Sequence, residues 1–111
     1  MNFKSNRVYV FSAPVDMRKS YDGLYGLVRS EFDVLSGHLF LFVSHDRKRA
    51  KCLFWDGTGL NILMKRIEKG RFADILTRKE VSLNELKLFF EGSREVVKRL
   101  SPEDLSAQFL Q

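Results

Sequence analysis

The residues of this chain whose types and spacing could do chemistry are mainly basic. Arg18 and Lys19 directly precede a predicted helix start, where unsatisfied backbone N–H groups and the positive end of the helix dipole favour an anion such as phosphate. Trp55 lies at the end of a predicted strand and could stack on an unpaired base. The other basic candidates, in the middle of the chain, are Arg47, Arg49, Lys65, Arg66, Lys69 and Arg71. Together these residues predict contacts to the phosphates of a nucleic acid.

The positive charge is concentrated in one part of the chain. The 111 residues have a formal net charge of +5 and a pI near 9.6. Residues 47–79 contain ten Lys or Arg against three acidic residues, a local excess of seven, whereas the rest of the chain carries a net charge of −2. Such an excess repels itself unless an acidic partner neutralises it, which favours a nucleic-acid surface. The alternative is a solvated rim of cations, in which Arg18 would simply pair with Asp16.

Patterns for catalysis and metal binding are weak. His38, His45 and Cys52 do not have the spacing of a zinc site. The sequence has no GxxxxGK(S/T) phosphate-binding loop and no readable Ser-His-Asp arrangement. We therefore predict no catalytic residues, no metal and no cofactor. A metal-dependent nuclease is the least favoured alternative, since its chemistry needs carboxylates that converge. The available carboxylates are Asp16, Asp56 and Glu68.

Length and composition bound the class of protein. The chain fits one domain, and its 44% hydrophobic and 30% charged residues are ordinary for a globular protein. No apolar run approaches the roughly 18 residues needed to span a bilayer, and the first residues lack a signal-peptide pattern. Cys52 is the only cysteine, so no internal disulfide can form. These features predict a cytoplasmic protein with no membrane partner.

Three apolar stretches and one turn predict a sheet. Runs rich in β-branched and aromatic residues predict strands over 7–11, 38–43 and 50–55. The Asp56-Gly57 pair that follows is typical of a β-hairpin. Residues 59–70 fit either a helix or a returning strand, and the preceding turn favours the strand. We expect antiparallel pairing in this part of the chain, with a short edge strand before residue 81.

Two helices are predicted to pack on this sheet. Apolar residues at helical spacing, with Ser20 as N-cap, predict a helix over 21–32. Gly23 and Gly26 would leave a strip without side chains, which predicts close packing against a neighbouring element. A capping-box pattern predicts a second helix over 82–92. The predicted fold is therefore α+β, a single domain with a small, mostly antiparallel sheet packed by two to three helices.

The last residues form a separate part of the prediction. Ser101-Pro102 is typical of a third helix start, so we divide the chain into a domain over 1–92 and a C-terminal helical extension over 93–111. The helix containing Phe89 and Phe90, with this extension, suggests an alternative function as a protein-interaction module. In that case the chain would bind a partner protein without contacting DNA.

Three stretches in this order resemble a known family. They are VDMRKSYDGLYGLV (15–28), SGHLFLF (36–42) and KxLxWDGTGL…KRIEKGRF (51–72). Together they are similar to the TnpB-type accessory protein, the second open reading frame, of insertion sequence 66 family transposable elements. The resemblance covers residues 8–92. The motif positions carried over are Asp16, Met17, Arg18, Lys19, Asp22, Gly23, Trp55, Asp56, Gly57, Lys65, Arg66, Glu68, Gly70, Arg71 and Phe72.

The resemblance implies a role in transposition beside a larger transposase of the Asp-Asp-Glu type, which would hold the catalysis. It implies a non-enzymatic helper whose expected partners are DNA and the transposase subunit, and it leaves self-association open. The sequence departs from the family pattern in three places. Ser20 stands where Gly is common, Ala73-Asp74 stands where many members have Trp-Pro, and no aromatic pair follows Gly92.

Overall fold

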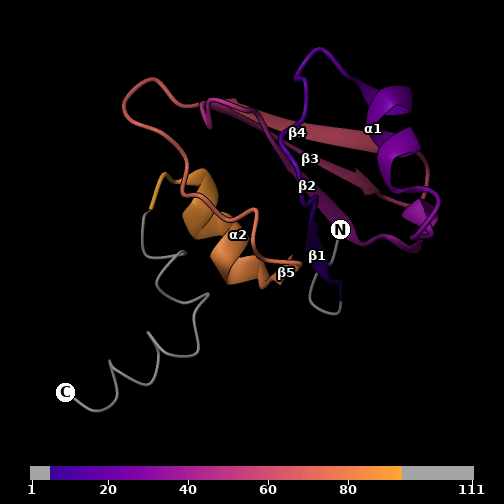
Figure 1. Ribbon diagram of the computed structural model, residues 1–111. Coiled ribbons are helices and arrows are strands. Elements are labelled where there is room, and N and C mark those ends of the chain that lie inside the picture. The colour runs from indigo at the N-terminus through magenta and orange to yellow at the C-terminus, as the bar shows by residue number, and fades with distance from the viewer. Residues whose placement is uncertain (1–5, 94–111) are drawn as a thin grey trace.

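A five-stranded sheet with one helix on each face forms the part of the chain that the structure describes (Figure 1). The computed structural model describes residues 6–93. The strands are β1 Val8–Val10, β2 Leu39–Val43, β3 Arg49–Trp55, β4 Leu60–Arg66 and β5 Glu80–Val81. The helices are α1 Tyr21–Val28 and α2 Leu83–Phe90, with a short 3-10 turn, η1, at Val34–Ser36. The α+β prediction is confirmed with two helices, and the third helix predicted after residue 100 lies outside the described residues.

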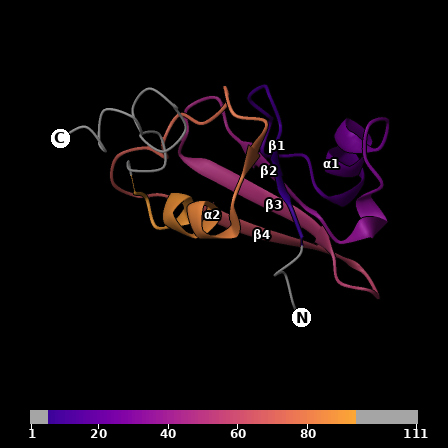
Figure 2. The ribbon, with the colours of Figure 1, turned by 90° about the horizontal axis from the view of Figure 1, so that it is seen from below.

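The strand order is β4-β3-β2-β1-β5. Only β1 and β2 run parallel, because the chain crosses back through α1 between them, and the other three pairs are antiparallel. The mostly antiparallel sheet is therefore confirmed, and the predicted short edge strand is β5. Figure 2 shows β1 to β4 side by side in this order, with α2 lying across one face. Among residues 6–93, no helix is both long and apolar enough to cross a bilayer.

Strand alternation sends apolar side chains to two separate cores. On one face, Leu41 and Cys52 pack with Phe89 of α2. On the other face, Phe42 and Leu53 pack with Leu24 of α1. Because successive side chains of a strand point to opposite faces, the continuously apolar β2 is buried over its whole length, as expected of a central strand.

The turn between β3 and β4 decides the structure of residues 59–70. The Asp56 carboxylate accepts hydrogen bonds from the backbone N–H of Thr58 and of Gly59, at 2.9 and 3.0 Å. These bonds lower the pKa of Asp56, that from Thr58 most strongly. The turn sends the chain back as β4, which pairs with β3 along seven residues. The prediction of a returning strand is thus confirmed for 60–66.

The capping predicted from the sequence is present in one helix and not in the other. In α2 the capping box is complete, since Ser82 Oγ accepts from the Glu85 N–H and the Glu85 carboxylate accepts from the Ser82 N–H. In α1, Ser20 occupies the N-cap position, but its side chain makes no capping hydrogen bond. Helix α1 also ends at Val28, short of the predicted residue 32.

The prediction that Gly23 and Gly26 let α1 approach another element is wrong. A Cβ on Gly26 would meet no atom within 4 Å. A Cβ on Gly23 would lie 3.1 Å from the Cβ of Lys19, within the same segment. Gly23 therefore makes room for the aliphatic stem of Lys19, which folds back over the first turn of α1.

Candidate nucleic-acid interface

Three segments that are distant in sequence meet at one end of the sheet. The loop before α1 is held there because the Val15 N–H donates to the carbonyl oxygen of Val43, the last residue of β2, at 2.9 Å. The segment after β4 returns to the turn between β2 and β3. Its Ile67 and Phe72 N–H groups donate to the carbonyl oxygens of Lys48 and Arg47, at 2.8 and 2.7 Å.

These segments enclose an open hollow of about 890 Å³, which we call the basic hollow. Arg18 comes from the loop before α1, Arg49 from the start of β3 and Arg71 from the segment after β4. Ser44 and His45 of the β2–β3 turn also line it, as do the carboxylates of Asp16 and Asp46. The structure thus brings together three of the cations predicted from the sequence, each supplied by a different segment.

Arg66 lies next to the basic hollow. It is directly opposite Arg49 in the β3–β4 register, so both side chains leave the same face of the sheet. Like charges at such a cross-strand position destabilise a sheet, which makes this pair unfavourable for the fold alone. Within residues 6–93, no carboxylate lies within salt-bridge distance of Arg49 or Lys69.

Three of the predicted cations are paired with neighbouring acids. The Arg18 guanidinium donates to both Asp16 carboxylate oxygens, from Nε to Oδ1 at 3.1 Å and from Nη2 to Oδ2 at 2.7 Å. This pairing holds the pKa of Asp16 at about 2. Arg66 donates to Glu68 at 2.9 Å, and Arg47 lies 3.9 Å from Asp74. The pairing of Arg18 with Asp16 is the alternative that the sequence left open.

The turn that carries His45 is ordered by Asp46. Its carboxylate accepts from the Ser44 hydroxyl at 2.6 Å and from the Lys48 N–H at 3.0 Å. These hydrogen bonds, the one from Ser44 above all, lower the pKa of Asp46, so this carboxylate is ionised at neutral pH. Arg47 adopts a left-handed backbone, with φ of 58°, and this allows the chain to reverse tightly here.

Lys51 positions the loop before α1, a role that sequence reasoning missed. Its side chain is only 8% exposed, beneath that loop on the α1 face of the sheet. Its ammonium donates to the carbonyl oxygens of Met17 and Lys19, at 2.8 and 2.7 Å. The only signal available was a lysine placed between Ala50 and Cys52 in a strand that is otherwise apolar. Lys51 thus fixes the backbone on both sides of Arg18.

The other predicted contact residues lie outside the lining of the basic hollow. Trp55 is at the opposite end of β3 from Arg49, six residue steps or about 20 Å away. Lys65 faces α2, and its ammonium donates to the Phe90 carbonyl oxygen at 2.6 Å. Lys19 and Lys69 are exposed beside the hollow, in the loop before α1 and in the turn after β4.

The carboxylates proposed for a nuclease are not gathered. Asp56 lies at the β3–β4 turn, at the far end of the sheet from Asp16, and within residues 6–93 no three His, Cys, Asp or Glu residues are close enough to hold a metal ion. His38 has a structural partner, since its Nδ1 accepts from the Arg7 N–H at 3.0 Å. Cys52 is buried, which raises the pKa of its thiol to about 12.

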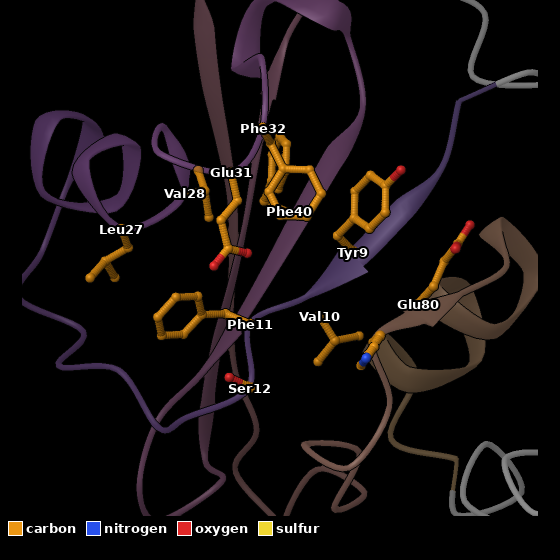
Figure 3. Close-up of a pocket in the computed structure, with 11 residues that line it drawn as sticks. Tyr9, Val10, Phe11, Ser12, Leu27, Val28, Glu31, Phe32, Phe40 and Glu80 are labelled. Carbon is orange, nitrogen blue, oxygen red and sulfur yellow. The ribbon is translucent and has the colours of Figure 1, made fainter.

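A second hollow, of about 440 Å³, is lined mainly by apolar and aromatic residues and lies between β1 and the end of α1. Figure 3 shows the rings of Tyr9, Phe32 and Phe40 gathered on one side of it, with Phe11 and the Glu31 carboxylate on the other. The ring centroids of Tyr9 and Phe32 are 4.5 Å apart. We call this second hollow the aromatic pocket.

The aromatic residues of α2 do not form such a surface. Phe89 is fully buried and stacks on Phe72, with ring centroids 4.7 Å apart. Phe90 is half-buried and packs edge-on against both rings. Phe89 therefore fills the core between α2 and the sheet, whereas Phe90 also lines an apolar groove beside β4, and a partner bound by this helix stays a prediction.

Comparison with known proteins relates this chain to a family. Residues 6–99 match the family model described as IS66 Orf2 like protein. The chain is also 37% identical, over 68 residues, to the uncharacterized protein y4jC of Sinorhizobium fredii. That match covers 60% of this chain and 58% of the relative, so it spans little more than half of each. No solved structure matches the chain significantly.

Proposed function

This chain belongs to the IS66 Orf2 like protein family, and from that premise we propose that it assists DNA transposition by binding DNA phosphates in the basic hollow. Family membership supports the accessory role in transposition. The DNA contact is argued from the charges and positions of the residues. We propose Arg18, Arg49 and Arg71 as the central contacts. The residues proposed to follow the DNA backbone at the rim are Lys19, Arg47, Arg66 and Lys69.

The observation that carries the proposal is the convergence of three arginines from separate segments on one concave surface. An arginine guanidinium is a planar fork of donors that matches a phosphate in geometry as well as in charge. The opposition of Arg49 and Arg66 across two strands costs stability and brings the fold no evident gain. Such a cost is typical of a binding surface, where a bound polyanion would offset it.

Contacts of this kind supply affinity rather than choice of sequence, because phosphates are the same at every base pair. We therefore infer that the protein holds DNA in place while the transposase selects the site and performs the strand transfer. Trp55 is left outside this surface, since it lies about 20 Å from Arg49 along β3. Lys65 is also left outside, because its ammonium already binds the carbonyl oxygen of Phe90.

The test is a fluorescence-anisotropy titration of labelled duplex DNA with charge-reversal variants. We expect Arg49→Glu and Arg71→Glu to weaken binding by about tenfold or more, since each removes a contact and adds a repulsion. Arg29→Glu is the matched control: Arg29 is the exposed C-cap of α1, outside the basic hollow, and the change in net charge is the same. Equal losses for all three variants, or no binding by the wild type, would contradict the proposal.

Folding of the variants can be checked independently. In Arg49→Glu the new carboxylate would face Arg66, so this variant should melt at a temperature no lower than that of the wild type. A loss of DNA binding would then report the contact itself rather than unfolding.

The aromatic pocket favours a second candidate function, namely binding of the transposase without DNA contact. The rings of Tyr9, Phe11 and Phe32 are only half-covered in the free chain, and aromatic side chains are common anchors at protein interfaces. Charge reversal at Arg66 and Arg71 separates the two functions. Capture of the transposase should survive these changes if the aromatic pocket carries the activity, whereas DNA binding should not.

A further inference from the structure

The two edges of the sheet are protected to different degrees. The edge strand β5 has only two residues, and the Arg78 guanidinium donates to the Glu80 carbonyl oxygen at 2.9 Å. The edge strand β4 has seven residues and pairs only with β3 within the described part of the chain. A long edge strand presents unpaired N–H and C=O groups, which are a template for another strand, and proteins usually shorten or shield such edges.

Apolar side chains are exposed along β4. Leu63 is 54% exposed and Met64 is 47% exposed, although both are large and apolar. Because they are adjacent in the strand, they point to opposite faces, so the exposure belongs to the edge rather than to one face. On the α2 face, an apolar groove of about 580 Å³ continues from Leu63 to Phe90. Exposed apolar surface of this kind commonly marks an interaction site.

The sequence of β4 allows antiparallel pairing with a second copy of itself without opposing like charges. If a twofold axis perpendicular to the sheet relates the two copies, the α1 face of one copy continues into the α1 face of the other. Even-numbered residues of β4 can then lie opposite only even-numbered residues of the copy, and odd-numbered residues opposite only odd-numbered ones. With the axis at Ile62, Ile62 faces its own copy and Leu60 faces Met64. The same register places Lys65 opposite Gly59 and Arg66 opposite Thr58, so no like charges oppose each other.

We propose that a second copy of this chain pairs with β4 in this register, joining the two sheets into one of ten strands. The basic hollow lies at the Arg66 end of β4, so the antiparallel pair would carry two hollows, on the same face and at opposite ends of the joined strands. Two linked phosphate sites bind one DNA segment more tightly than either site alone. The dimer itself requires no DNA.

The first test measures the molecular mass in solution without DNA. At about 100 µM the wild type should sediment at about twice its chain mass of 13.0 kDa. Leu63→Lys should raise the dissociation constant by about tenfold or more, because it replaces an interface leucine by a charge. Leu35→Lys is the matched control, since Leu35 is 52% exposed in η1, away from β4, and it should dimerise as the wild type does.

The second test places β4 at the interface through a cysteine cross-link. In the proposed dimer the two copies of residue 63 are diagonal neighbours, about 7–8 Å apart, which suits a short bis-maleimide. Leu63→Cys should therefore give a covalent dimer, whereas the equally exposed Leu35→Cys should not. The native Cys52 should not react with the maleimide, since its thiol is buried.

A folded wild type that is monomeric at about 100 µM, or cross-linking of both cysteine variants to the same extent, would overturn the dimer. If Leu63→Lys does not fold, the cross-linking of Leu63→Cys still tests whether the dimer forms through β4. None of these measurements involves DNA, so a failed dimer and a failed phosphate contact can be told apart.

Discussion

The balance between Asp16 and Arg18 determines how much positive charge the basic hollow offers. With a pKa of about 2, Asp16 is ionised at neutral pH and compensates the guanidinium in the free protein. Because the folded pKa lies below the ordinary value of 3.8, this pair favours the fold above pH 3.8 and loses that effect as the pH falls through about 2. A DNA phosphate must therefore compete with Asp16 for Arg18.

Removing the charge of Asp16 should strengthen DNA binding. Asp16→Asn keeps an acceptor for the Arg18 N–H but frees the guanidinium from its competing carboxylate, so we expect DNA affinity to rise several-fold. The measurement is the same anisotropy titration. Asp33→Asn is the control, because Asp33 also accepts a backbone N–H and carries the same charge, but lies at the start of η1. An equal gain in both variants would mean that only net charge matters.

At the scale of elements, Lys51 joins β3 to the loop before α1. A buried ammonium with two carbonyl partners ties that loop to the sheet, so the position of Arg18 depends on a residue in the next strand but one. In the sequence, Lys51 begins the KxLxW stretch and counts among the ten Lys and Arg of residues 47–79. Its geometry instead gives it a positioning role, because the burial keeps it from solvent.

Replacing Lys51 should therefore cost stability. Lys51→Met retains the length and apolar stem of the side chain but leaves the Met17 and Lys19 carbonyl oxygens without their donor, so we expect the free energy of unfolding to fall by about 2 kcal/mol. Denaturant unfolding measures it. Lys48→Met is the control: Lys48 is exposed in the β2–β3 turn, and its loss should leave stability nearly unchanged. Equal effects of the two changes would contradict the positioning role.

For the whole molecule, the distribution of charge matters more than its total. Three arginines and two carboxylates line the basic hollow, whereas Glu31, Glu80 and Lys79 are the charged residues that line the aromatic pocket. The basic hollow is therefore the surface that would face a polyanion, and the aromatic pocket is a separate surface.

Salt should act in opposite directions on the free protein and on its DNA complex. With three phosphate contacts, binding should weaken about forty-fold between about 50 and 200 mM salt. Over the same range the free protein should become slightly more stable, because salt screens the repulsion between Arg49 and Arg66. Anisotropy and thermal melting measure the two effects. A dissociation constant for DNA that does not change with salt concentration would exclude phosphate contacts as the source of the affinity.

Several elements could be predicted because their causes lie within a few residues. The Asp56-Gly57 turn and the Ser82 capping box need only neighbouring backbone groups, and both formed as predicted. Helix α1 was predicted too long because Phe32 continues its apolar spacing. In the fold, Phe32 lies in a turn after the helix has ended and packs against Tyr9 and Phe40. Its ring is therefore partly buried by contact with the sheet rather than by a position in the helix.

The sequence by itself determined the first three strands, the turn at Asp56-Gly57, the capped helix α2, the family and the concentration of charge in residues 47–79, because each of these depends on composition or on close neighbours. Only the tertiary structure decided which cations meet. Strand register and loop return bring Arg18, Arg49 and Arg71 to one hollow, while Lys65 and Trp55 are directed elsewhere. The physical reason is that the distance between two side chains across a sheet is set by pairing and by the face they leave, and neither can be read from their separation along the chain.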